Sequence, residues 1–154
     1  MVYKEVQQDL FSVSPDYYLV HCISADFKMG AGIAKKFAEM GTKDWLFDLY
    51  DDKPYPWKGK GDCVYTWAAK AKGKYKGVFH LITKRMYYEK PTYATLRQAL
   101  ESLKESCAPN FHDVKKIAMP KIGCGLDRLD WDKVKPIIQK VFADTDVEIL
   151  VCYL

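Results

Sequence analysis

A glycine-containing loop at positions 121–127 holds the residues of this chain that are best suited to chemistry. It reads Lys-Ile-Gly-Cys-Gly-Leu-Asp and comes directly after an apolar run at residues 117–120. Glycine lacks a Cβ and tolerates positive φ, so such a loop lets backbone N–H groups approach an anionic ligand closely. Asp127 ends the loop, where its carboxylate can act on the bound molecule. The pattern predicts an anion-binding loop with a general base or an orienting carboxylate at its end.

A second small-residue loop, Met29-Gly30-Ala31-Gly32, opens an expected helix. A junction of this kind suits an anion, because unpaired N–H groups and the positive end of the helix dipole converge there. The dinucleotide fingerprint is incomplete, since Lys35 occupies its third small position, and no Gly-Lys-Ser/Thr of a P-loop follows. Alone, this loop is explained equally well by a tight turn. Together, the two loops suggest a clamp around a phosphorylated small molecule.

The elements that must position these loops follow from hydrophobic periodicity. Apolar runs predict strands over residues 2–6, 17–23, 63–68, 77–83, 114–119 and 147–152. Helical spacing predicts helices over 31–40, from the N-cap Thr92 through Leu103, and after the N-cap Asp130, with a kink or a later start because of Pro136. Residues 41–61 are expected to be mostly loop, with one short helix near 45–49. Strands alternating with helices indicate a single α/β domain over residues 1–154, with ligand loops at the carboxyl ends of its strands.

Composition excludes several classes of protein. The chain has 154 residues, 49% hydrophobic and 29% charged, without an apolar run of membrane-spanning length or a secretory N-terminal segment. Five cysteines without a CxxC pair favour reduced thiols in the cytoplasm, or in the nucleus of a eukaryote. Three histidines without metal-ligand spacing argue against a metal-dependent mechanism. We therefore expect no metal, no cofactor and no membrane association, and we expect a monomer.

The net charge of +4 suits a polyanionic ligand. Lysines and aromatic residues alternate in one segment: Lys53, Trp57, Lys58, Lys60, Tyr65, Trp67, Lys70, Lys72, Lys74, Tyr75 and Lys76. Such a segment could bind a single nucleic-acid strand through phosphates and stacking. A hairpin with a solvated lysine face is the favoured interpretation. Likewise, His21 is expected to be a core histidine, Asp26 a loop acceptor and Cys124 a structural thiol.

Several strings, read together, resemble the macro domain family. They are Asp9-Leu10-Phe11, His21-Cys22-Ile23-Ser24, Met29-Gly30-Ala31-Gly32-Ile33-Ala34, Leu81-Ile82-Thr83-Lys84, Lys90-Pro91-Thr92-Tyr93 and residues 119–129. More narrowly, they are similar to the terminal ADP-ribose protein glycohydrolase branch. No matched string falls within residues 41–76. The resemblance implies a three-layer α/β/α fold with a mixed central sheet and ADP-ribose in a surface crevice.

The resemblance also assigns the ligand to particular residues. It places the adenosine near Asp9 and Leu10, with Leu154 bordering the adenine, and Ser24 beside the distal ribose. It places the diphosphate between Met29, Gly30, Ala31, Gly32 and Ile33 on one side and Lys121, Ile122, Gly123, Cys124, Gly125 and Leu126 on the other.

Lys84 and Asp127 match the catalytic pair of that branch. The implied reaction releases ADP-ribose esterified to acidic side chains of proteins, or carried by DNA, with related deacetylation of O-acetyl-ADP-ribose. A neutral lysine amine attacks an anomeric carbon readily, and Asp127 can serve as acid or base. The like charge of Arg85 and partial burial would both favour the neutral amine.

Three alternatives stay open: an ADP-ribose reader without turnover, a phosphatase acting on ADP-ribose 1″-phosphate, and a nucleic-acid-binding protein. The sequence also does not choose between a covalent lysine adduct and direct attack by water that Asp127 orients.

Overall fold

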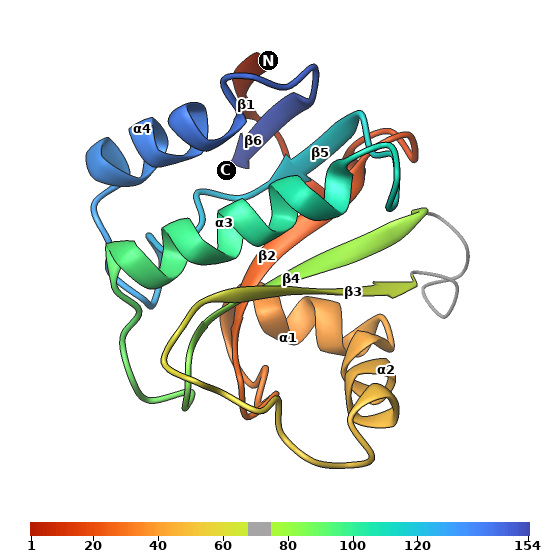
Figure 1. Ribbon diagram of the computed structural model, residues 1–154, viewed down its shortest axis with the longest axis vertical. Coiled ribbons are helices and arrows are strands. Elements are labelled where there is room, and N and C mark those ends of the chain that lie inside the picture. Colours follow the sequence, from red (N-terminus) through yellow and green to blue (C-terminus); the bar gives the residue numbers. More distant parts are fainter. Residues whose placement is uncertain (68–74) are drawn as a thin grey trace.

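The computed structural model describes residues 1–67 and 75–154 (Figure 1). Their strands form one sheet in the order β1-β6-β5-β2-β4-β3. The strands are β1 (Val2–Gln7), β2 (Tyr18–Ser24), β3 (Asp62–Trp67), β4 (Gly77–Lys84), β5 (Lys116–Met119) and β6 (Glu148–Tyr153). β3 is antiparallel to β4, whereas the other neighbouring pairs are parallel. The predicted mixed sheet is confirmed.

Helices cover both faces of this sheet (Figure 1). α1 (Gly32–Glu39) and α2 (Thr42–Leu49) lie on one face, and α3 (Tyr93–Cys107) and α4 (Trp131–Phe142) lie on the other. A 3₁₀ turn, η1 (Leu10–Ser12), follows β1. Each face carries its own cluster of buried apolar side chains. The three-layer α/β/α architecture expected from the sequence is therefore confirmed.

The central strands are apolar on both sides because both sides are covered. In β4, Phe79 and Leu81 pack toward α3 and α4, while Val78 and Ile82 join the cluster on the opposite face. All four side chains are fully buried. This two-sided burial explains why β4 is a continuous hydrophobic run rather than an alternating one.

The two predicted N-caps are present. Thr92 and Thr95 form a reciprocal capping box at the start of α3, and Asp130 accepts a hydrogen bond from the backbone N–H of Asp132. α4 begins at Trp131 and continues through Pro136, so a later start is wrong. Proline removes only one backbone hydrogen bond there, and the buried apolar face of α4 holds the helix in place.

The segment after α1 contains more structure than its sequence indicated. α2 begins at Thr42, directly after Gly41 in a left-handed conformation, and not near residue 45. β3 then pairs with β4, so the favoured hairpin is present. Of the residues in the lysine-rich segment, Lys70, Lys72 and Lys74 lie outside the described part of the chain, as does Ala68 at the end of the predicted strand.

Two histidines occupy the centre of the sheet. His21 Nε2 and His80 Nδ1 are 2.7 Å apart, and His80 Nε2 lies 2.9 Å from the Thr66 hydroxyl. Both rings are fully buried, and burial lowers the pKa of His80 to about 3 and the pKa of His21 well below its usual value. Nδ1 of His21 has no hydrogen-bond partner among the described residues, so this core histidine is only half satisfied. The pair is neutral and structural.

Candidate active site

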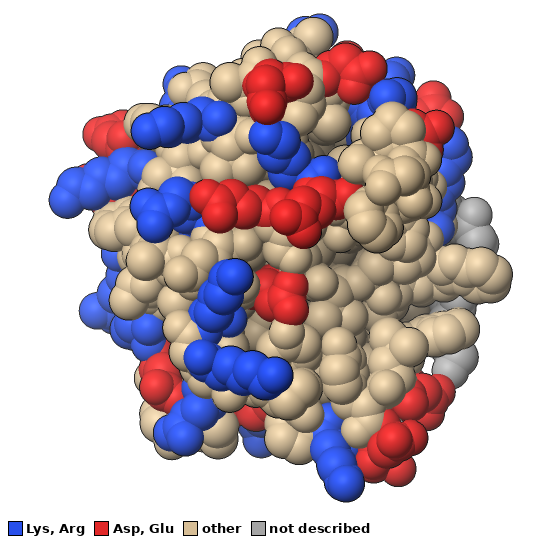
Figure 2. Space-filling model, viewed as in Figure 1, with Lys and Arg blue, Asp and Glu red and all other residues tan. Residues whose placement is uncertain are grey.

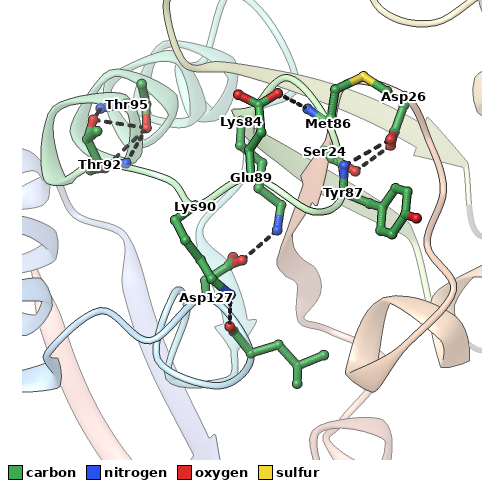
Figure 3. A network of polar contacts seen from close by, with 11 residues as sticks. Ser24, Asp26, Lys84, Met86, Tyr87, Glu89, Lys90, Thr92, Thr95 and Asp127 are labelled. Atoms are coloured by element: carbon green, nitrogen blue, oxygen red, sulfur yellow. Dashed lines mark hydrogen bonds and ion pairs between the residues drawn. The ribbon is translucent and has the colours of Figure 1, made fainter.

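Lys84 and Asp127 meet at the carboxyl edge of the sheet (Figure 3). Lys84 is the last residue of β4, and Asp127 belongs to the loop between β5 and α4. The lysine Nζ donates a hydrogen bond of 2.6 Å to Asp127 Oδ1. The side chains are 13% and 16% exposed, so the pair is partly shielded from water but reachable. A carboxylate in this position can accept the lysine proton and return it.

Arg85, the residue after Lys84, forms an ion pair within its own segment. Its guanidinium pairs with Glu89 at 3.3 Å, and its side chain is 62% exposed. The positive charge next to Lys84 thus has a carboxylate partner of its own.

The loop between β2 and α1, residues 25–31, is built from strained backbone. Phe27 and Met29 adopt φ values of +56° and +45°, a region that side-chain-bearing residues seldom occupy. Both side chains are buried. Such strain persists only where the surroundings hold it, and it is concentrated at functional sites.

Residues 43–55 supply those surroundings. The Phe27 ring contacts Phe47 and Tyr50, with ring centroids 5.4 and 5.7 Å apart. Lys43 Nζ donates to the carbonyl of Lys28 at 2.9 Å, and the N–H of Tyr55 donates to the carbonyl of Ala25, also at 2.9 Å. The segment that no sequence string matched therefore holds the first loop in shape.

Asp26 lies near the start of this loop and accepts more hydrogen bonds than the sequence indicated (Figure 3). Its carboxylate accepts hydrogen bonds from the Ser24 hydroxyl and from the backbone N–H groups of Lys28 and Tyr87. Ser24, which the family resemblance assigns to the distal ribose, is 5% exposed. The sequence identified Asp26 only as a local acceptor, because Tyr87 is 61 residues away.

The loop between β5 and α4 is held mainly by its own backbone. The N–H of Leu129 donates to the carbonyl of Gly123 at 2.7 Å, and those of Cys124 and Arg128 donate to Lys121 and Gly125. Gly123 has φ +74°, and a Cβ there would lie 2.9 Å from the Leu129 side chain. This glycine is required by the fold.

Gly125 is not required by packing in this way. A Cβ at this position would meet no atom within 4 Å, so the protein itself leaves room for a side chain. Gly32 faces the same loop, since a Cβ there would lie 3.5 Å from the Leu126 side chain. The two predicted loops thus come together.

The residues assigned to the adenosine lie at the other end of this sheet edge. Asp9 follows β1 and caps η1 by accepting the N–H of Phe11, while the neighbouring Leu10 is buried. Leu154 follows β6, the partner of β1, and is 88% exposed. β1 and β4 are four strand positions apart, roughly 19 Å at ~4.8 Å per strand. Asp9 and Lys84 are therefore separated by a span suited to an elongated ligand, with both glycine loops between them.

Cys124 is poorly suited to be a nucleophile. Its thiol donates to the carbonyl of Ile122 at 3.3 Å, and burial raises its pKa to about 11. Thiolate, not thiol, is the reactive form. This geometry agrees with a structural role.

Two hollows lie away from the catalytic pair. One, of about 420 Å³, lies between the start of β3 and α3, and one of about 1010 Å³ lies between α3 and α4. Neither is lined by Lys84, Asp127 or the glycine loops. Figure 2 shows a band of acidic side chains over α3, with basic side chains on either side of it. Among the residues that the structure describes, this face does not offer a continuous basic track for a nucleic acid.

Two aromatic residues of the lysine-rich segment, Tyr65 and Tyr75, also serve the fold. Tyr65 packs against Phe79 with ring centroids 5.1 Å apart, and Tyr75 is 5% exposed. Within residues 1–67 and 75–154, no cluster of His, Cys, Asp and Glu is placed to hold a metal ion. Over the same residues, every helix is too short or too polar to cross a bilayer.

Comparison with known proteins agrees with this arrangement. Residues 20–138 match the model of the Macro domain family. A Bos taurus protein named ADP-ribose glycohydrolase OARD1 is 42% identical over 95% of this chain and 88% of its own length, and the Homo sapiens protein of that name is 40% identical over the same shares. The macrodomain of Mycobacterium tuberculosis DarG superposes with a TM-score of 0.79 at 20% identity, covering 99% of this chain and 98% of that one. This last likeness is one of fold.

Proposed function

The chain belongs to the macro domain family, and from that premise we propose that it is a hydrolase that releases ADP-ribose from esters with acidic side chains. The observation that carries the proposal is the contact between Lys84 and Asp127 beside the two glycine loops. The names of the mammalian relatives support the class of activity. The expected partners are ADP-ribose, O-acetyl-ADP-ribose and ADP-ribosylated protein, bound by a monomer.

Binding would follow the edge of the sheet. The adenosine would lie near Asp9, Leu10 and Leu154, and the diphosphate would lie between the two glycine loops. Gly125 supports this placement because the fold does not itself require a glycine there. The distal ribose would then reach Ser24 and the catalytic pair.

The proposed reaction begins with proton transfer from Lys84 to Asp127. The neutral amine attacks the anomeric carbon, the bond between this carbon and the ester oxygen breaks, and the carboxylate leaves. The protonated glycosylamine passes a proton to its ring oxygen and opens to a Schiff base. Water then hydrolyses the Schiff base, so that lysine is released as an ammonium, the sugar ring closes to free ADP-ribose, and Asp127 loses its proton to solvent. In the other route, Asp127 takes a proton from a water molecule that attacks directly, and Lys84 stabilises the leaving carboxylate. Borohydride trapping during turnover separates the two routes, because only the first contains a reducible lysine adduct.

The decisive test is mass spectrometry of an ADP-ribosylated glutamate peptide before and after incubation with the protein. We expect Lys84→Ala and Asp127→Ala to abolish turnover. ADP-ribose affinity should stay within about tenfold, ~1.4 kcal/mol, because the binding loops are intact. Full turnover by both variants would contradict the catalytic assignment.

The same assay separates the alternatives. A reader would bind ADP-ribose without releasing it from the peptide, and a phosphatase would instead consume ADP-ribose 1″-phosphate. ADP-ribosylated DNA as a second substrate is tested by replacing the peptide with a modified oligonucleotide. A nucleic-acid-binding protein would retain an unmodified oligonucleotide with a steep dependence on salt.

A further inference from the structure

The carboxylate of Asp26 extends the pairing of β2 and β4 beyond the ends of the two strands. We propose that Asp26 is a positioning residue: it fixes the loop between β4 and α3, and with it Lys84, against the first glycine loop. This inference rests on the proposed function, and it adds a residue to which neither the sequence strings nor the catalytic pair assigned a role in the reaction.

Backbone pairing ends at the catalytic lysine. Ser24 is in register with Lys84, and the N–H of Ala25 donates to the carbonyl of Lys84 at 2.9 Å. Three residues past Lys84, the N–H of Tyr87 donates to Asp26 Oδ2 at 2.9 Å. A side-chain carboxylate thus takes the place of the next backbone acceptor. The chain is anchored on both sides of Arg85 and Met86, directly after the lysine.

The second carboxylate oxygen of Asp26 organises the substrate side. Oδ1 accepts the Ser24 hydroxyl at 2.5 Å and the N–H of Lys28 at 3.0 Å. Hydrogen bonds to an ionised acceptor are stronger than neutral ones. Asp26 therefore fixes the hydroxyl that would face the distal ribose and the chain that carries Lys84 at the same time. Figure 3 shows the Asp26 carboxylate joined by dashed lines to both Ser24 and Tyr87.

The loop between β4 and α3, which Asp26 holds, is also closed by hydrogen bonds of its own. The N–H of Met86 donates to the Glu89 carboxylate at 3.1 Å, and the N–H of Glu89 donates back to Met86 at 3.0 Å. At its far end, Lys90 Nζ donates to the carbonyl of Leu126 at 2.6 Å. The loop is thereby attached to the first glycine loop through Asp26 and to the second through Lys90. Releasing one attachment lets the turn, and the end of β4, shift relative to the bound sugar.

Such a shift affects catalysis far more than binding. A misplacement of about 1 Å at the reacting groups costs about 10²-fold in rate, because attack requires a near-ideal approach. The adenosine and diphosphate contacts proposed above do not involve Asp26. Loss of this carboxylate should therefore lower kcat and leave the affinity for free ADP-ribose nearly unchanged.

Asp26→Asn is the sharpest variant. Asparagine keeps one oxygen for Ser24 and Lys28, but it directs an N–H₂ donor at the N–H donor of Tyr87. Only the attachment between the two loops is lost. Asp146→Asn is the matched control. Asp146 is 76% exposed and precedes β6, so it lies at the amino-terminal ends of the parallel strands, whereas Lys84 lies at a carboxyl end.

The experiment combines kinetics with amide hydrogen exchange. For D26N we expect kcat on an ADP-ribosylated glutamate peptide to fall about 10²-fold, with KM and ADP-ribose Kd within threefold of wild type and faster exchange of the Tyr87 amide. D146N should match wild type in all four measurements. The inference is overturned if D26N keeps kcat within twofold, or if Tyr87 exchange is unchanged. A parallel loss of kcat, ADP-ribose affinity and melting temperature also overturns it, because that pattern indicates a merely structural residue. If the wild-type protein does not turn over the peptide, the proposed function fails, and Tyr87 exchange still tests the attachment.

Discussion

The two glycine-containing loops of the site are held by opposite means. Residues 25–31 depend on contacts from elsewhere in the chain. The Phe27 ring packs against α2 and the segment after it, and backbone carbonyls of the loop accept hydrogen bonds from the Lys43 side chain and the backbone N–H of Tyr55. Residues 121–129 depend on hydrogen bonds within the loop and on glycine conformations. One loop is formed by tertiary packing and the other by local sequence.

This difference determines what each loop can tolerate. Left-handed Phe27 and Met29 each cost of the order of 1–3 kcal/mol of backbone strain, which burial of their side chains must offset. The first loop is consequently coupled to global stability. The second carries an open position at Gly125 and a 66% exposed Leu126, so changes there should affect the ligand more than the fold.

The strongest way to test the contrast is Phe27→Ala. Phe27 is fully buried between Phe47 and Tyr50, and truncation of such a ring typically costs 3–5 kcal/mol. We expect a loss of about that size in the free energy of unfolding, measured by urea denaturation, together with weaker ADP-ribose binding. Leu126→Ala is the matched change in the second loop and should leave unfolding within about 0.5 kcal/mol. Equal losses in the two variants would remove the distinction.

Acidification should act on the layer beneath the first loop. The His21 ring stacks on Phe37 of α1 at 3.9 Å and pairs with His80, whose pKa burial lowers to about 3. The unfolded chain binds protons at these histidines below about pH 6.5, whereas burial keeps both rings neutral to lower pH in the folded chain, to about pH 3 for His80. Stability is therefore complete above pH 6.5 and falls as the pH drops through this window.

The expected loss is on the order of 2 kcal/mol from His80 between pH 6.5 and pH 5, with a further loss in the same direction from His21. Urea denaturation at the two pH values measures it. A flat stability over this range would show that the buried pair does not control acid unfolding.

Glycine substitutions probe the second loop. Gly125→Val should weaken ADP-ribose binding at least tenfold, ~1.4 kcal/mol, because a side chain blocks close approach of the backbone, while unfolding is unchanged. Gly123→Val should also lower stability, since its φ of +74° and the Leu129 side chain exclude a Cβ. Calorimetry and urea denaturation distinguish the two effects. Wild-type affinity in G125V would refute the role of this loop in binding.

The limits of sequence reasoning follow the same division. Local signals predicted the strands and the Thr92 and Asp130 caps, because each depends on neighbouring residues. The family resemblance paired Lys84 with Asp127, 43 residues away. Topology alone predicted only that ligand loops lie at the carboxyl ends of the strands.

Most of the missed features depend on contacts between distant segments. No local signal pairs Phe27 with Phe47, Asp26 with Tyr87, or His21 with His80 over 59 residues. The Arg85–Glu89 pair is local, yet it was missed because it lies in a loop without helical periodicity. The interactions that shape the first loop therefore could not be predicted from the sequence, whereas the second loop could be recognised from its own residues.

The smallest expected effect concerns the bond that joins the β4–α3 loop to the second glycine loop. Lys90 Nζ donates to the carbonyl of Leu126 at 2.6 Å in an exposed setting, where water competes for the donor and we expect no more than the ordinary contribution of a hydrogen bond, about 0.5–1.5 kcal/mol. Lys90→Met keeps the length of the side chain and removes the donor. We expect ADP-ribose affinity to fall two- to tenfold, measured by calorimetry, with unfolding unchanged, because the loop retains its internal bonds but loses its lateral support. An unchanged affinity would mean that the internal hydrogen bonds alone hold the second loop. The two loops would then differ completely, one held by distant contacts and the other by its own residues.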